Sequence, residues 1–168
     1  MESKLKLLGH PVHPMLIVFP LGLLSTAFIF DLLYLATGNE ELATFAFWAI
    51  AAGVVGGLLA AIFGLWDWLG IPSDTRAKRL GLIHGGGNVV VTGLFAVSWL
   101  LRMDDPSYLP ESSLPLIVAL LGVAIALFTA WLGGELVYRL RVGVDDDAGL
   151  NASSSLADSG LADVDRPA

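Results

Sequence analysis

Four long runs that are almost free of charge constrain this chain more than any other feature of its sequence. They cover residues 14–36, 43–66, 80–101 and 114–138; none contains Lys or Arg, and the only acidic residues in them are Asp31 and Glu135. A helix needs about 20 apolar residues to cross the hydrocarbon core of a bilayer, and each run is long enough. The sequence therefore predicts four transmembrane helices.

The connections between these runs are short and polar, which determines how the helices must be arranged. Successive helices joined by a few residues return through the membrane as neighbours. Composition agrees with a membrane protein, because 15% of the residues are charged whereas soluble domains carry about 25%. We predict an all-α integral membrane protein, an antiparallel four-helix bundle formed by residues 1–144, with no evident repeat of 20 to 50 residues.

The end of the chain differs from the rest in composition. Residues 145–168 contain six aspartates among Ser, Ala and Gly residues, which bury little apolar surface. Such a segment is predicted to be a disordered acidic tail.

Basic residues predict the orientation of the bundle. Arg102 falls on one side of a four-span arrangement, and seven basic residues fall on the other, namely Lys4, Lys6, Arg76, Lys78, Arg79, Arg139 and Arg141. Cytoplasmic loops carry the excess of Lys and Arg, so both termini are predicted to be cytoplasmic in a multi-pass protein of the cell (inner) membrane. The lipid bilayer is the expected partner, and the sequence has no basic patch for nucleic acid.

Cysteine is absent, and this narrows the chemistry that the chain can support. Disulfides, thiolate zinc sites, iron–sulfur ligation and covalent c-type haem attachment all need cysteine. The remaining candidate ligands are His, Asp, Glu, Met and backbone oxygens. No residue is assigned a catalytic role, and we do not predict an autonomous enzyme.

Polar residues of all four spans are predicted to lie at one depth, near the cytoplasmic side. His13 opens the first span and Asp67 closes the second. His84 and Asn88 lie early in the third span on one helix face, because they are four residues apart. Glu135 lies near the end of the fourth span.

This layer predicts a cofactor site. Imidazole binds haem iron and divalent transition metals, and carboxylates can complete a metal shell. One interpretation is a haem b site with His13 and His84 as axial ligands and Asn88 beside them. The other is a divalent metal bound by His13, His84, Asp67 and Glu135. In either case the protein would be a redox-associated subunit with a membrane or redox protein as its partner.

Two alternatives remain open. In the first, the protein is a non-catalytic scaffold, where His13 caps a helix, His84 bonds a neighbouring carboxylate and the tail binds a partner. In the second, Asp67, His84 and Glu135 form a proton or ion pathway.

Two further features predict structure rather than chemistry. Asp31 lies toward the outer end of the first span, where Arg102 is the only basic residue, so we predict an ion pair between them. The alternative is an acid that reaches water at the interface. Pro20 lacks the N–H that the Leu16 carbonyl would accept, so the first span should bend near its cytoplasmic end.

Four short motifs at the ends of the spans resemble those of the domain of unknown function 2231 family. They are His13-Pro14 with Phe19-Pro20-Leu21-Gly22, Gly64-Leu65-Trp66-Asp67-Trp68, Leu82-Ile83-His84 with Asn88, and Trp131-Leu132-Gly133-Gly134-Glu135-Leu136-Val137-Tyr138 with Val142-Gly143-Val144. The resemblance covers residues 8 to 144. It implies a prokaryotic four-span membrane domain without an established activity. Some relatives are joined to Rieske-type iron–sulfur domains, which implies a redox setting.

Overall fold

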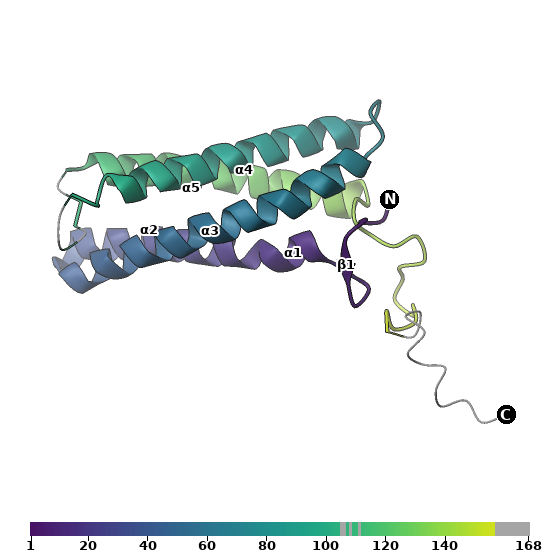
Figure 1. The fold of residues 1–168 in the computed structure, drawn as a ribbon, viewed down its shortest axis with the longest axis horizontal. Coiled ribbons are helices and arrows are strands. Elements are labelled where there is room, and N and C mark those ends of the chain that lie inside the picture. Colours follow the sequence, from purple (N-terminus) through teal and green to yellow (C-terminus); the bar gives the residue numbers. More distant parts are fainter. Residues whose placement is uncertain (105–106, 108, 111, 157–168) are drawn as a thin grey trace, which may run out of the picture.

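The computed structural model describes residues 1–104, 107, 109–110 and 112–156, and its architecture is a bundle of four long helical spans (Figure 1). The spans cover Val12–Thr37, Glu40–Gly70, Arg76–Leu100 and Leu114–Arg139, and each is long and apolar enough to cross a membrane. The predicted all-α, antiparallel membrane bundle is confirmed. The N-terminus, the end of the fourth span and the connection between the second and third spans lie at one end of the bundle, which we call the terminal end.

Six helices and one small ladder make up these spans and their leader. The elements are β1 (Lys6–Leu7), β2 (His10–Pro11), α1 (Val12–Leu16), α2 (Val18–Thr37), α3 (Glu40–Gly70), α4 (Arg76–Leu100), α5 (Leu114–Gly134) and the π-helix η1 (Glu135–Arg139). The strands β1 and β2 pair antiparallel. We call α1, α2 and α3 the first hairpin, and α4, α5 and η1 the second hairpin.

The helices extend beyond the apolar runs because polar residues cap them. Asn39 accepts a hydrogen bond from the backbone N–H of Glu41 at the start of α3. Gly38, with φ of 70°, ends α2, so the turn between the two helices is only two residues long. Thr75 likewise accepts from the N–H of Lys78 and starts α4 at Arg76, four residues before the apolar run.

The first span is interrupted where a bend was predicted. Ile17 separates α1 from α2, one turn before Pro20. Because proline has no N–H, the Leu16 carbonyl has no donor four residues later. The short helix α1 can therefore take a direction of its own, and it carries His13 against α3.

The second hairpin repeats the burial pattern of the first, a relation that the sequence did not reveal. Each buried residue of α2 has a buried counterpart 71 positions later, in or just after α4. The pairs are Leu24 and Phe95, Ala27 and Ser98, and Asp31 and Arg102. Four buried residues of α3 have buried counterparts 69 positions later in α5, and these pairs are Ala46 and Pro115, Ile50 and Ala119, Gly53 and Gly122, and Ala60 and Thr129.

Equivalent contacts accompany this equivalent burial. A Cβ added to Gly53 would lie 2.5 Å from the Leu24 side chain, and one added to Gly122 would lie 2.9 Å from Phe95. In each hairpin, the glycine lets a large side chain of the first helix pack against the second. Small residues at such positions allow close helix approach in membranes.

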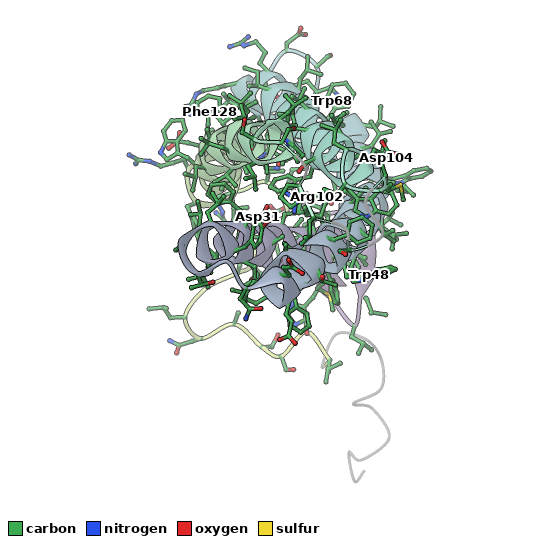
Figure 2. All side chains as sticks on the ribbon, turned by 90° about the vertical axis from the view of Figure 1, so that its left-hand side faces the viewer. Asp31, Trp48, Trp68, Arg102, Asp104 and Phe128 are labelled. Atoms are coloured by element: carbon green, nitrogen blue, oxygen red, sulfur yellow. The ribbon has the colours of Figure 1, made fainter. Side chains whose placement is uncertain are left out.

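The two hairpins are related by an approximate two-fold axis along the bundle. They run in the same direction and present equivalent faces to a common core, which requires a rotation of about half a turn between them. Figure 2 views the bundle from the far end, and Asp31 and Arg102 lie between the hairpins near the middle. These equivalent residues therefore meet at the axis.

A leader and a tail cover the terminal end. The Ser3 hydroxyl donates to Asp67 of α3 (2.6 Å), and Lys6 forms ion pairs with Glu2 and Asp145. Residues 145–156 contain turns but no helix or strand, and the Ser155 hydroxyl donates to the Leu8 carbonyl. The rest of the predicted disordered tail, residues 157–168, lies outside the described residues.

Candidate two-histidine site

His13 is held against the second helix of its own hairpin. Its Nδ1 lies 2.9 Å from the carbonyl oxygen of Ala60 in α3. The ring also rests on Gly64, where an added Cβ would lie 2.8 Å from Cε1 of His13. The glycine therefore makes room for the imidazole, and the carbonyl fixes its orientation.

His84 is held in the same way in the second hairpin. Its Nδ1 lies 2.8 Å from the carbonyl oxygen of Thr129 in α5. The ring rests on Gly133, where an added Cβ would lie 3.1 Å from Cε1 of His84. Glycine and carbonyl thus play the roles that they play for His13.

The two histidines are equivalent under the internal repeat. His84 follows His13 by 71 positions, and Thr129 and Gly133 follow Ala60 and Gly64 by 69. A carbonyl oxygen only accepts hydrogen bonds, so Nδ1 of each neutral ring carries the hydrogen and donates it. The Nε2 atom of each imidazole then carries the lone pair that can bind a metal.

The Nε2 atoms differ in their surroundings. The amide nitrogen of Asn88 lies 3.3 Å from Nε2 of His84, and it also donates to the His84 carbonyl. The Asn88 side-chain oxygen accepts from the Thr129 hydroxyl at 3.0 Å. For Nε2 of His13, the described part of the chain offers no hydrogen bond. Asn88 therefore lies beside His84, as expected because the two residues share one face of α4.

Asp67 and Glu135 are engaged elsewhere. Asp67 accepts from Ser3, and Glu135 pairs with Arg76 at 2.9 Å and approaches Arg139 at 3.9 Å. Within the described part of the chain, no histidine donates a hydrogen bond to either carboxylate. Among the described residues, no group of three or more His, Asp or Glu side chains is gathered closely enough to hold a metal ion. The structure therefore pairs the histidines with backbone carbonyls, and it does not bring the two carboxylates to them.

At the far end of the bundle, the predicted ion pair between Asp31 and Arg102 is confirmed. Two guanidinium nitrogens of Arg102 each reach one carboxylate oxygen of Asp31 at 2.7 Å. Both side chains are fully buried, so the alternative of an acid exposed at the interface does not apply. Ser98 accepts a further hydrogen bond from Arg102 at 3.2 Å.

Sequence reasoning missed the residues that orient the histidines. Ala60 and Thr129 accept these hydrogen bonds through their backbone carbonyls. Every residue has such a carbonyl, so the residue types at these positions do not indicate the contact. The glycines did give a signal, because Gly64 and Gly133 each lie four residues after the residue whose carbonyl accepts from a histidine. An alignment of the chain with itself at offsets of 71 and 69 would have found this correspondence.

The fold and these contacts define a four-span integral membrane protein with an equivalent pair of histidines near one end. The chain belongs to the domain of unknown function 2231 family, because the model of that family, described as a predicted membrane protein, matches residues 9–146. Comparison with curated proteins and with solved structures gives no match.

Proposed function

We propose that the protein binds a b-type haem through His13 and His84 and serves as a redox-associated membrane subunit. The observation that carries this proposal is the pair of equivalent bonds from Nδ1 to the carbonyls of Ala60 and Thr129. Histidines that bind metals almost always donate their other ring N–H to a carbonyl or carboxylate, which fixes the tautomer and the ring orientation. Both histidines already meet this requirement.

The number of available ligands favours haem over a metal ion bound by side chains alone. Haem iron takes four ligands from its porphyrin and needs only one or two from the protein. A structural or catalytic metal ion usually needs three or four protein ligands. Asp67 and Glu135 are bonded to Ser3 and Arg76, which leaves the two histidines as ligands. Two histidines are enough for haem iron but too few for a metal ion held by side chains alone.

Glycines follow His84 on α4. Gly85 and Gly86 lie on the exposed surface of the helix, where an added Cβ would meet no atom within 4 Å. Gly87, in contrast, packs against Thr129 and holds α4 to α5. For His84 to bind iron, Nε2 must give up its 3.3 Å contact with the amide of Asn88. Bound haem would supply reversible one-electron chemistry within the bilayer.

The proposed orientation places this site near the cytoplasmic face of the cell (inner) membrane. The basic residues of the α3–α4 connection, the leader and η1 belong to the terminal end, and the excess of Lys and Arg faces the cytoplasm in most membrane proteins. A membrane or soluble redox protein on that side is the proposed partner.

A scaffold without a cofactor is the second candidate, and the Asn88 network favours it. Asn88 bonds His84 and Thr129, so it joins α4 to α5 entirely within the protein. Buried polar networks in which every group is bonded hold helices in one arrangement. In this case, His84 would serve packing alone.

The absorption spectrum of protein purified from a haem-replete host in a mild detergent separates the two candidates. The haem proposal predicts a Soret band with stoichiometric haem, which His13→Ala and His84→Ala should each strongly reduce. Asp67→Asn and Glu135→Gln should retain the band, since the two carboxylates bond Ser3 and Arg76. Folded wild-type protein without haem, or His84→Ala protein with only a lower melting temperature, would support the scaffold instead.

A further inference from the structure

The internal repeat raises the question of what makes the first hairpin pair with the second. Their inward faces carry equivalent buried residues at equivalent positions, and most of these are small or apolar. Apolar packing between helices has little direction, so it discriminates weakly between related partners. The hairpin of another copy of the chain could offer much the same surface.

Asp31 and Arg102 are the exception to this similarity. They occupy equivalent positions, face each other across the approximate two-fold axis and are both fully buried. If two first hairpins paired in this geometry, Asp31 would face a second Asp31 without a cation. Two second hairpins would bring two guanidinium groups together. A buried charge without a partner of opposite sign is costly in a membrane.

We infer that the Asp31–Arg102 pair directs each first hairpin to a second hairpin and excludes pairing between like hairpins. Polar groups at a buried interface fix the choice of partner in other helical assemblies. Within one chain the correct partner is always present at high effective concentration, through the short connection between α3 and α4. The ion pair therefore favours a closed bundle over dimers in which like hairpins of two copies have paired.

Cysteine crosslinking can test this inference, because the chain contains no cysteine of its own. Gly22 of α2 and Gly93 of α4 are equivalent positions where an added Cβ meets no atom within 4 Å. The neighbouring interface positions Gly57 and Thr92 face each other between the hairpins, since a Cβ on Gly57 would lie 3.0 Å from the Thr92 hydroxyl. The double variant Gly57→Cys/Thr92→Cys therefore reports the native pairing within one chain.

The experiment compares this cysteine pair in four full-length backgrounds after mild oxidation in membranes. With Asp31 and Arg102 intact, we expect one intramolecular crosslink and a monomer on a non-reducing gel. The exchanged background, Asp31→Arg/Arg102→Asp, should behave in the same way, since its pair is merely reversed. The like-charge background with Arg102→Asp alone should lose most of the intramolecular crosslink. The neutral background, Asp31→Asn/Arg102→Gln, should lose part of the intramolecular crosslink, because pairing between like hairpins separates position 57 from position 92.

Two controls make the outcome decisive. The single variants Gly57→Cys and Leu21→Cys, carried on differently tagged chains and coexpressed, should give a mixed dimer only in the neutral background, because Leu21 is the equivalent of Thr92 in the first hairpin and would face Gly57 of another copy when like hairpins pair. Cysteines at Gly22 and Gly93 should give no dimers in the intact background beyond those of random collision. Mixed dimers of equal yield with Asp31 and Arg102 intact would overturn the inference, as would a neutral background that stays fully monomeric or an exchanged background that loses its crosslink.

Discussion

Single residues determine the energetics of this bundle at the few places where polar groups are buried. Asp31 and Arg102 have no exposed surface, and their two bonds of 2.7 Å are bidentate. Desolvation offsets much of the attraction in such a pair, but removing one partner leaves the other charge buried alone. The pair was predictable because Arg102 is the only basic residue of the sequence on that side of the membrane.

Neutralising one member of the pair should therefore cost more than neutralising both. We expect Asp31→Asn or Arg102→Gln alone to reduce the free energy of unfolding by about 3–5 kcal/mol, and the double variant to lose less than either single variant. Thermal unfolding of the wild type, the two single variants and the double variant in one detergent measures these losses as a double-mutant cycle. Asp74→Asn is the matched control, since Asp74 is exposed in the α3–α4 connection. Additive losses would contradict the coupling.

The glycines under the histidines provide a second test at the scale of residues. Gly64→Ala and Gly133→Ala place a methyl group 2.8 Å and 3.1 Å from the imidazoles. We expect each to displace its ring and to weaken cofactor binding about as much as the loss of a supporting contact does, roughly 10- to 100-fold.

Gly93→Ala is the control for this test, because an added Cβ there meets nothing within 4 Å. Alanine in an exposed helix position is more favourable than glycine by about 1 kcal/mol, so the control should be neutral or slightly more stable. Equal binding by Gly133→Ala and wild-type protein would show that the imidazole position does not depend on this glycine.

At the scale of elements, hydropathy predicted each span but not its full extent. Apolar runs mark only the part of a helix that faces lipid, whereas Asn39 and Thr75 cap α3 and α4 in the polar region beyond. The interruption at Ile17 followed from the missing N–H of Pro20. The repeat is faint in the sequence, because a few positions such as His13 and His84 are identical while others such as Asp31 and Arg102 differ in residue type, and it becomes plain only in burial and contacts.

The leader is joined to the tail by charges that should respond to pH only outside the physiological range. Hydrogen bonds to Asp145 and Glu2 raise the pKa of Lys6 to about 12, and the bond to Lys6 lowers the pKa of Glu2. The stabilisation from Lys6 is present below its ordinary pKa of about 10.4 and is lost as pH rises through about 12. The stabilisation from the Glu2 carboxylate is present above its ordinary pKa of about 4.3 and is lost as pH falls through the lowered pKa of the folded protein.

Spin labels at Leu7→Cys and Ala148→Cys, both exposed positions, can measure this dependence. We expect a narrow distance distribution from about pH 5 to pH 9 and a broader one below about pH 4. Lys6→Gln should broaden the distribution already at neutral pH. A transition between pH 6 and pH 8 would contradict the assignment of this contact to Lys6 and its two carboxylates.

At the scale of the whole molecule, each of two equivalent hairpins holds one of two equivalent histidines. Each hairpin supplies one imidazole with Nδ1 bonded to a carbonyl, so neither hairpin alone can offer a pair of ligands. The sequence predicted His13 and His84 from their depth in the membrane. It could not show that Asp67 and Glu135 would bond Ser3 and Arg76, because those bonds depend on how the leader and the α3–α4 connection fold back.

The spin state of the iron tests the central claim most directly, because it reports whether both histidines bind the same haem. Electron paramagnetic resonance of the oxidised, detergent-solubilised protein should show six-coordinate low-spin iron in the wild type. Replacing either His13 or His84 with alanine should leave one protein ligand and give high-spin iron, or release the haem. Wild-type protein that is folded but binds no haem would contradict the claim, as would low-spin iron that persists without either histidine.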